Sequence, residues 1–191
     1  MKKLIKIFSL FLFTLNSNCQ TLPLNSMDEP NNGGYLKDLD NKLPFWVGTW
    51  KGVAENKEYT FEFNIFLHQQ KNFSIERYYY VDELVGKFKV VDLVTNNILY
   101  NDLMVTNFED YKISLLSYNQ YNGYSFLFND DELHCDNLIE FQLIKNPSNP
   151  NQINYVNFSY SEFIPTLDCP YSNRDDIPML LPKVDLILVR E

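Results

Sequence analysis

Polar and apolar residues alternate along most of the chain after Pro44. In residues 59–68 (Y-T-F-E-F-N-I-F-L-H), every second residue from Tyr59 to Leu67 is aromatic or aliphatic, and apart from Phe66 the residues between them are polar. Side chains point to opposite faces of a β-strand with a period of two, so this pattern is typical of a strand with one buried face. The segment therefore predicts a half-buried strand.

The same pattern recurs in short segments that are separated by turn-forming residues such as Asn122-Gly123 and the run N-P-S-N-P at 146–150. No long window has helical spacing. Many short, evenly spaced strands predict an all-β protein, and we expect an antiparallel up-and-down β-barrel of roughly eight to ten strands. The expected strands are 47–54, 59–68, 73–81, 84–91, 98–105, 111–118, 124–128, 138–144, 153–160 and 184–190.

The chain before Pro44 has a different character. Residues 20–34 are mostly polar and punctuated by Pro and Gly, which favours a flexible leader. Apolar residues between Tyr35 and Leu43 then recur at near-helical spacing, which predicts one short N-terminal helix that ends before the proline. We expect residues 35–191 to form a single barrel domain, in which residues 164–183 form a long, Pro-rich connection before the last strand.

Residues 1–19 have the features of a secretory signal peptide. Lys2, Lys3 and Lys6 precede a short apolar run at 7–15, and the sequence then turns polar. About 20 apolar residues are needed to span a membrane as a helix, so this run is too short for an anchor helix. We expect an exported protein, found in the periplasm or as an outer-membrane-associated lipoprotein, and otherwise secreted.

Cys19 has two interpretations. In bacterial lipoproteins a cysteine at the end of the signal peptide becomes the lipid-bearing N-terminus, which would make Cys19 a lipid anchor. The alternative is ordinary cleavage after Cys19, which leaves Gln20 as the first residue.

The charge balance excludes some partners. The chain has 16 Lys and Arg against 25 Asp and Glu, a formal net charge of −9, and without the three Lys of residues 1–19 the charge is −12. A nucleic-acid-binding protein needs a basic face, which this composition does not favour. Anionic lipid head groups would repel such a chain, so we expect contact with a membrane only through a lipid anchor.

The chain has three cysteines, and Cys19 is the one within the predicted signal segment. Cys135 and Cys169 remain as an even pair near predicted loops, and exported proteins form disulfides. We expect these two residues to form a disulfide. The alternative is two buried thiols.

Motifs for catalysis are absent from the sequence, which has neither a Gly-rich phosphate loop nor a G-x-S-x-G nucleophile turn. The two histidines, His68 and His134, are not spaced as metal ligands. Residues 129–137 (N-D-D-E-L-H-C-D-N) could be a metal site or an acidic loop, and they lack the D-x-[DN]-x-[DN]-G order of a calcium loop. Residues 78–80 (Y-Y-Y) could line a ligand cavity or cover a sheet face. We expect no catalytic residue, no metal site and no cofactor.

Several short motifs are spread over nearly the whole chain. They are G-Y-L-K-D at 34–38, V-G-T-W-K-G at 47–52, L-V-G-K-F-K-V at 84–90, N-I-L-Y at 97–100, and C-P-Y at 169–171 followed by Ile177-Pro178 and Leu181-Pro182. Together they resemble a family of small exported bacterial proteins that is known as a domain of unknown function. The family has no established activity or site residues, so the resemblance implies none here.

A second, local resemblance concerns residues 45–51 (F-W-V-G-T-W-K), which are similar to the G-x-W first strand of lipocalins and fatty-acid-binding proteins. This resemblance implies a barrel that holds a small apolar ligand, although no helical pair follows the first strand as in fatty-acid-binding proteins. It also implies a barrel-closing contact, in which Arg190 of the last strand packs over Trp50. The alternative is a solvent-exposed Arg190 with Trp50 buried among aliphatic side chains.

Two functions therefore remain open from the sequence. The first is a non-enzymatic envelope protein that binds a small apolar ligand in the barrel. The second is a structural or interaction module that has a filled barrel and binds another envelope protein; an enzyme is a third and less favoured alternative. An apolar interior cavity above roughly 300 Å³ would favour the first, and a filled core would favour the second.

Overall fold

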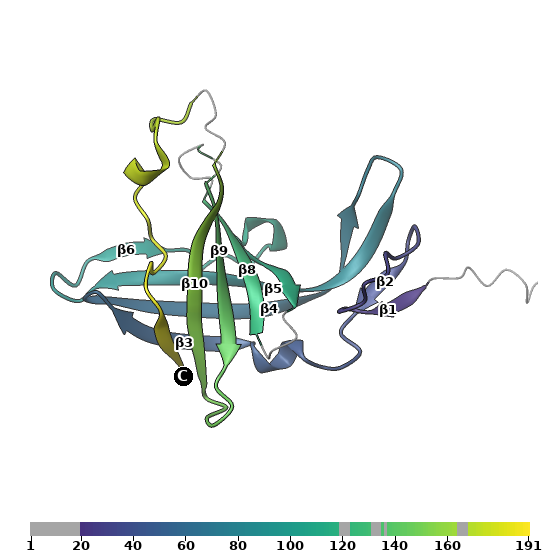
Figure 1. Ribbon diagram of the computed structural model, residues 1–191, viewed down its shortest axis with the longest axis horizontal. Coiled ribbons are helices and arrows are strands. Elements are labelled where there is room, and N and C mark those ends of the chain that lie inside the picture. Colours follow the sequence, from purple (N-terminus) through teal and green to yellow (C-terminus); the bar gives the residue numbers. More distant parts are fainter. Residues whose placement is uncertain (1–19, 119–122, 131–134, 136, 164–167) are drawn as a thin grey trace, which may run out of the picture. The chain divides into compact units, whose positions relative to one another are not determined.

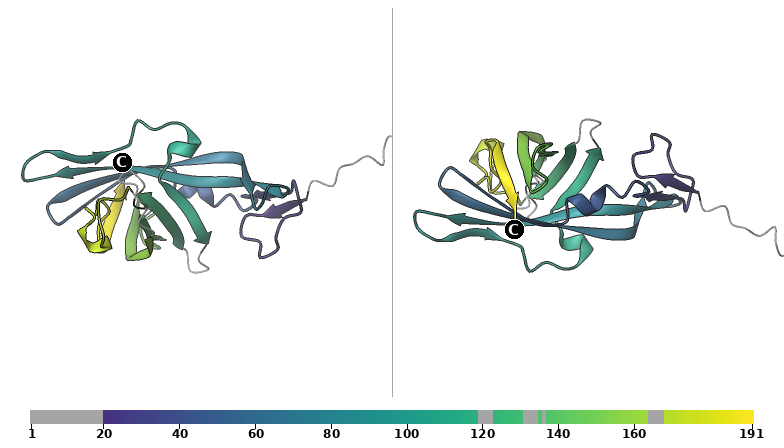
Figure 2. Two further views of the ribbon diagram at one scale, coloured as in Figure 1. Left: turned by 90° about the horizontal axis from the view of Figure 1, so that it is seen from above. Right: turned by 90° about the horizontal axis from the view of Figure 1, so that it is seen from below.

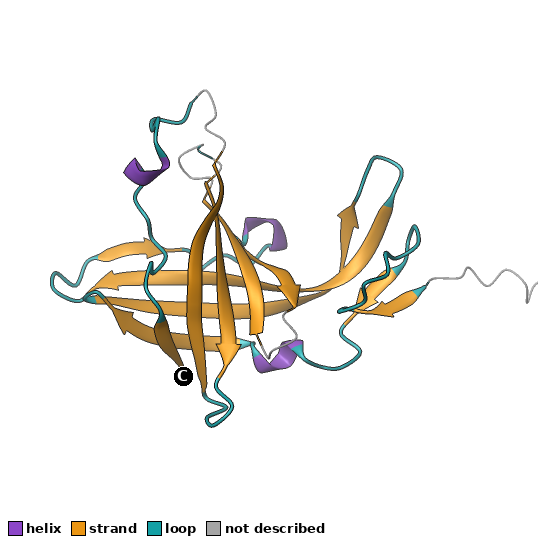
Figure 3. Cartoon of the chain, viewed as in Figure 1, coloured by secondary structure: helices purple, strands orange, loops and turns teal. Residues whose placement is uncertain are grey.

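The computed structural model describes residues 20–118, 123–130, 135, 137–163 and 168–191 (Figure 1). The predicted signal peptide, Cys19 and His134 lie outside the described residues. Strands make up most of the regular structure, together with short 3-10 helices (Figure 3). The strands are β1 (Thr21–Pro23), β2 (Tyr35–Lys37), β3 (Gly48–Ala54), β4 (Lys57–Asn72), β5 (Tyr78–Asp92), β6 (Ile98–Asn101), β7 (Ile113–Tyr118), β8 (Gly123–Asp130), β9 (Asn137–Lys145), β10 (Gln152–Phe163) and β11 (Leu186–Arg190), and the 3-10 helices are η1 (Leu43–Phe45), η2 (Phe108–Asp110) and η3 (Arg174–Asp176).

Strands β3 to β11, apart from β6, form a closed antiparallel barrel. Neighbours in the barrel follow the order β5-β4-β3-β11-β10-β9-β8-β7, and β7 pairs with β5 to complete the circle. The closing pairs are Val85 with Ser114 and Gly86 with Ile113, while Arg190 of the last strand pairs with Trp50 of the first barrel strand. Figure 2 views β7 to β10 end-on from two sides. The structure confirms the predicted antiparallel barrel, in which closure removes the two open sheet edges.

The alternation in the sequence determines which side chains enter the barrel. In β9, residues 137, 139, 141 and 143 are buried and the residues between them are partly exposed. The fully buried side chains of the barrel are mainly aromatic, and they come from most of its strands. Those with less than 2 % exposure include Trp46, Trp50, Tyr59, Phe61, Phe63, Phe88, Phe126, Phe128, Phe141 and Tyr155. The core is therefore built from large rings.

Residues 20–40 and 68–81 form a separate compact unit, and the barrel belongs to the unit of residues 41–67 and 82–191. In the first unit β1 pairs with β2, and β2 pairs with the start of β5, in both cases in parallel. His68 stacks on Tyr80 with the ring centroids 3.9 Å apart, and the Tyr35 ring meets the edge of this stack. Strands β4 and β5 contribute residues to both units.

Several expectations differ from the structure, and the strand expected at 98–105 is the shorter β6, which lies outside the barrel. The predicted N-terminal helix between Tyr35 and Leu43 is wrong, because Tyr35 and Leu36 instead pair with Tyr80 and Val81 in a sheet. Helix is limited there to the single turn of η1. Residues 20–34 are expected as a flexible leader, but they contain β1. Residues 78–91 are expected in two separate strands, but they lie in the continuous strand β5. Long-range strand pairing overrides the local spacing in these places.

Candidate functional site

Aromatic rings from opposite walls meet inside the barrel. Strands β4 and β9 have three strands between them in both directions around the barrel, so they face one another. Even so, the ring centroids of Phe61 on β4 and Phe141 on β9 are 6.4 Å apart. Tyr155 on β10 packs against both rings, with centroids 6.0 Å from Phe61 and 4.8 Å from Phe141. At this level the side chains of the barrel occupy its interior, as an eight-stranded barrel allows.

A further set of ring contacts joins four strands of the barrel. Phe63 of β4 lies 5.2 Å from Phe126 of β8, measured between ring centroids, and Phe126 lies 5.5 Å from Phe141 of β9. Phe88 of β5 meets the edge of Phe128 of β8 at 5.5 Å. None of these rings has exposed surface. These inward-facing rings thus pack on one another.

The two buried tyrosines of this core are poor candidates for acid–base chemistry. Burial raises the pKa of Tyr59 to about 12. Burial raises the pKa of Tyr155 still further, and the neighbouring Tyr59 and Asp185 act in the same direction. Both phenols therefore stay protonated and neutral at physiological pH, and neither serves as a base.

Arg190 covers Trp50 at one end of the barrel. Its guanidinium carbon lies 4.2 Å from the centroid of the Trp50 ring, and its Nη1 donates to the carbonyl of Val47 at 2.7 Å. Its Nη2 donates to the carbonyl of Phe45. The Trp50 indole in turn donates to the carbonyl of Trp46 at 2.8 Å. Of the two alternatives for this pair, the structure has the packed contact.

Lys145 adds a second cation to the same end. Its ammonium lies 4.0 Å from the centroid of the Phe45 ring and 5.3 Å from that of Trp46. Cations over aromatic faces are held by the ring quadrupole, most strongly where water is excluded. Arg190 and Lys145 therefore pack with the Phe45 and Trp46 rings at this end of the barrel.

Cys135 and Cys169 form a disulfide, with their Cα atoms 4.9 Å apart. Cys135 precedes β9 and is fully buried, while Cys169 lies in the connection between β10 and β11. The bond therefore ties the Pro-rich connection to the barrel. The structure confirms the predicted disulfide.

Outside the barrel, residues 102–112 link β6 to β7, and we call this segment the strap. Lys87 of β5 points outward but is only 6 % exposed. Its ammonium donates to the carbonyls of Leu103 and Val105 at 2.7 and 3.0 Å and pairs with Glu62 at 3.1 Å. Lys87 therefore anchors the strap to the outer face of the barrel.

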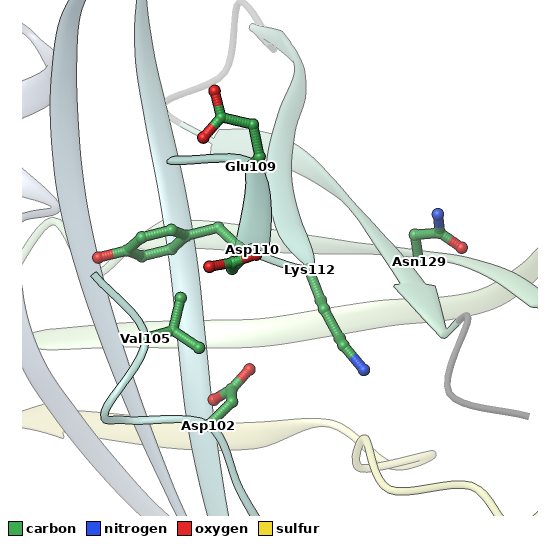
Figure 4. Close-up of a pocket in the computed structure, with 7 residues that line it drawn as sticks. Asp102, Val105, Glu109, Asp110, Lys112 and Asn129 are labelled. Carbon is green, nitrogen blue, oxygen red and sulfur yellow. The ribbon is translucent and has the colours of Figure 1, made fainter. Parts of the chain in front are cut away.

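A polar pocket of about 360 Å³ lies beside the strap. Figure 4 shows Lys112 and Asn129 together with the carboxylates of Asp102, Glu109 and Asp110 around it. The pocket is on the outside of the barrel and its lining is mostly charged or polar, so it is not the apolar interior cavity that a lipocalin-type ligand requires. The full lining is Asp102, Val105, Glu109, Asp110, Tyr111, Lys112 and Asn129.

The Asp102 carboxylate, which lines this pocket, makes hydrogen bonds that stabilise the fold. Its Oδ1 accepts the backbone N–H of Phe88 at 2.6 Å, and its Oδ2 accepts the hydroxyl of Tyr100 at 3.1 Å. Burial raises the pKa of Asp102, and these hydrogen bonds oppose that shift. Strands β6 and β7 both pair with β5. Between them, the Asp102 side chain takes the place of a strand partner for the Phe88 N–H of β5. Among the described residues, no group of three or more His, Cys, Asp or Glu side chains is arranged to hold a metal ion.

The three tyrosines at 78–80 lie in the unit of residues 20–40 and 68–81. Tyr78 meets Tyr80 edge-on, Tyr79 stacks on Phe73, and Tyr80 stacks on His68. These rings thus pack on neighbouring rings in pairs. Of the acidic run at 129–137, residues 131–134 and 136 lie outside the described residues.

Sequence reasoning missed the strap and its anchor Lys87. A partial signal was present, because in residues 84–91 (L-V-G-K-F-K-V-V) the face that carries Lys87 and Lys89 also carries two valines. Val85 faces outward yet is only 2 % exposed. A strand that is apolar on both sides is typical of one covered on both faces.

Within the described part of the chain, no helix has the length and apolar character needed to cross a membrane. A family model matches residues 1–191, and its description is "Family of unknown function (DUF6705)". No curated protein and no solved structure matches the chain.

Proposed function

The chain belongs to this family of unknown function, and we propose that it is a non-enzymatic protein-binding module of the bacterial cell envelope. In this proposal the barrel is a rigid scaffold, its interior is filled by its own side chains, and partners bind to its outer surface. The observation that carries the proposal is the contact between Phe61 and Phe141, 6.4 Å between ring centroids, across the full width of the barrel.

We further propose that the barrel is lipocalin-like in its architecture. Three features support this: the up-and-down order of the strands, the G-x-W motif at Gly48–Trp50, and the packing of Arg190 over Trp50. The filled interior separates it from lipocalins that hold a ligand. Shared architecture does not carry a shared function, because the binding site and not the fold determines what is bound.

Export is the second part of the proposal. The disulfide between Cys135 and Cys169 is compatible with an oxidising compartment. Mass spectrometry of the protein from envelope fractions should find an N-terminus at Cys19, with the added mass of lipid, or at Gln20 without it. A cytoplasmic protein that retains Met1 would contradict export.

Native mass spectrometry of the purified protein tests the filled barrel. We expect the mass of the polypeptide without an apolar ligand, and no saturable binding of benzene by the wild-type protein. The variant Phe141→Ala should gain benzene binding, because removing a buried ring leaves an apolar cavity that a small hydrocarbon can fill.

The control is Leu116→Ala, which removes a side chain that is 49 % exposed and should create no binding. A co-purified apolar ligand, or saturable benzene binding by the wild type, would overturn the proposal in favour of a ligand-binding barrel.

A further inference from the structure

Apolar side chains gather on two loops of the unit of residues 20–40 and 68–81. Ile75 is fully exposed at the turn between β4 and β5, and Phe73 of the same turn is 51 % exposed. Met27, in the loop between β1 and β2, is 95 % exposed. Single exposed apolar residues are common on protein surfaces, but several on neighbouring loops form an apolar patch. We call Met27, Phe73 and Ile75 the apolar tip.

Arg77 joins the two loops of the apolar tip. Its guanidinium carbon lies 5.1 Å from the centroid of the Phe73 ring, and its Nη2 contacts the carboxylate of Glu29, two residues after Met27, at 3.0 Å. The turn between β4 and β5 is closed as well, because the backbone N–H groups of Phe73 and Ser74 donate to the carbonyl of Arg77 at 2.8 and 3.2 Å. The fold therefore holds these apolar side chains together in solvent.

The N-terminal end of the described chain is attached to the same unit. The Tyr35 N–H donates to the backbone carbonyl of Gln20 at 2.7 Å, and the Asn31 N–H donates to its side-chain carbonyl at 3.0 Å. Strand β1 begins at the next residue, Thr21. Cys19 directly precedes Gln20 in the sequence. A lipid on Cys19 would therefore be joined to this folded unit without an intervening linker.

The hairpin that carries most of the apolar tip is less acidic than the chain as a whole. Residues 68–81 contain Lys71 and Arg77 against a single acidic residue, Glu76, whereas the chain has a net charge of −9. Apolar and aromatic side chains flanked by Lys or Arg are typical of segments that lie in the headgroup region of a bilayer, where the cations stay in contact with water and phosphate. The charge of this hairpin therefore does not oppose contact with a lipid surface.

We propose that the apolar tip inserts into the surface of the membrane that holds the lipid on Cys19. The inference rests on the lipid-anchored form of the proposed function and adds a second contact to the anchor. Three apolar side chains are too few to hold an acidic protein on a membrane by themselves. Next to an anchor they need not supply the attraction, because the lipid already keeps them at a high effective concentration near the surface. The two contacts together determine which side of the unit faces the membrane.

A tryptophan placed at the apolar tip measures this insertion. The lipid-bearing protein from envelope fractions is reconstituted into phosphatidylcholine vesicles with brominated acyl chains, which quench tryptophan only at close contact. We expect the emission that Ile75→Trp adds to the wild-type signal to fall by at least half in these vesicles, compared with unbrominated ones. Trp46 and Trp50 have no exposed surface and should give an unquenched background.

The matched control is Gln70→Trp, at an exposed position of β4 in the same hairpin but several residues before the turn. This tryptophan lies further from the apolar tip, so its emission should be nearly the same in the two kinds of vesicle. Thermal unfolding of both variants shows whether each keeps the fold.

Equal quenching at the two positions, or none in Ile75→Trp, would overturn the inference. Emission of Ile75→Trp that is already blue-shifted in detergent and is not quenched in vesicles would overturn it too, because another copy of the chain would then cover the tip. A processed protein that begins at Gln20 without lipid would also overturn it, but export and the filled barrel would stand. The benzene experiment concerns the barrel interior alone, so the two proposals can fail separately.

Discussion

Arg190 and Trp50 join the last strand of the barrel to the first. They are paired across β11 and β3, and the guanidinium carbon lies 4.2 Å from the centroid of the indole. Gly48 lies beside this contact, since a Cβ there would be in ordinary van der Waals contact with Nη1 of Arg190, at 3.4 Å. Gly48 also has a φ of +115°, a conformation that other residues rarely adopt. One side chain thus closes the barrel and holds the backbone around η1.

Arg190→Met should destabilise the protein by about 2–4 kcal/mol, because it removes the cation over the ring and leaves the carbonyls of Phe45 and Val47 without their charged donor. Urea unfolding followed by tryptophan fluorescence measures the change. Arg77→Met is the control, since Arg77 also lies over a ring, that of Phe73, but its ion pair with Glu29 is exposed. That variant should lose less than about 1 kcal/mol. Equal losses in both variants would contradict a closing role for Arg190.

The disulfide should contribute roughly 3–4 kcal/mol, because it closes a loop over a sequence separation of 34 residues and restricts the unfolded chain. The double variant Cys135→Ala/Cys169→Ala should therefore unfold at lower urea concentration than the oxidised protein. The reduced wild type should resemble the double variant. An oxidised protein with the stability of the reduced one would show that the bond does not constrain the unfolded state.

Gly52→Ala should destabilise the barrel by about 1–3 kcal/mol through overpacking. A Cβ at this position would lie 2.2 Å from Cδ1 of Leu186 and 2.6 Å from the carbonyl oxygen of Ile187. The backbone of β11 passes too close for any side chain at this point of β3. Ser125→Ala, on the partly exposed outer face of β8, should change the unfolding free energy by less than about 0.5 kcal/mol. Thermal unfolding of the two variants tests the difference.

Asp102 should make the protein more stable as the pH falls from neutral toward the ordinary pKa of an aspartate. Burial raises the pKa of this carboxyl in the folded state, so between the unfolded and folded pKa values the native protein binds more protons than the unfolded chain. Stability therefore decreases as the pH rises through this window. Asp102→Asn should show a weaker pH dependence over the same range, measured by urea unfolding at several pH values. An unchanged profile would exclude Asp102 as a source of the dependence.

The sequence by itself determined most β-strands of the barrel, although it divided β5 in two. Alternation is a local property, and it identified Tyr59–Leu67 as a strand because each residue's face follows from its parity. The pairing of Cys135 with Cys169 also followed from the sequence, since few cysteines were available. The contact between Trp50 and Arg190 came from a resemblance and matches the geometry.

Only the tertiary structure shows which side chains meet inside the barrel. Parity places Phe61 and Phe141 inside, but it does not say that they lie at the same level on opposite walls, which depends on the tilt and register of all eight strands. The strap and its anchor Lys87 depend in the same way on a long-range contact. At Tyr35 and Leu36 the local spacing was misleading. It predicted a helix, but in the structure these residues pair with Tyr80 and Val81 in a sheet. Hydrogen bonds between residues that are distant in the chain stabilise that strand, and local periodicity contains no information about them.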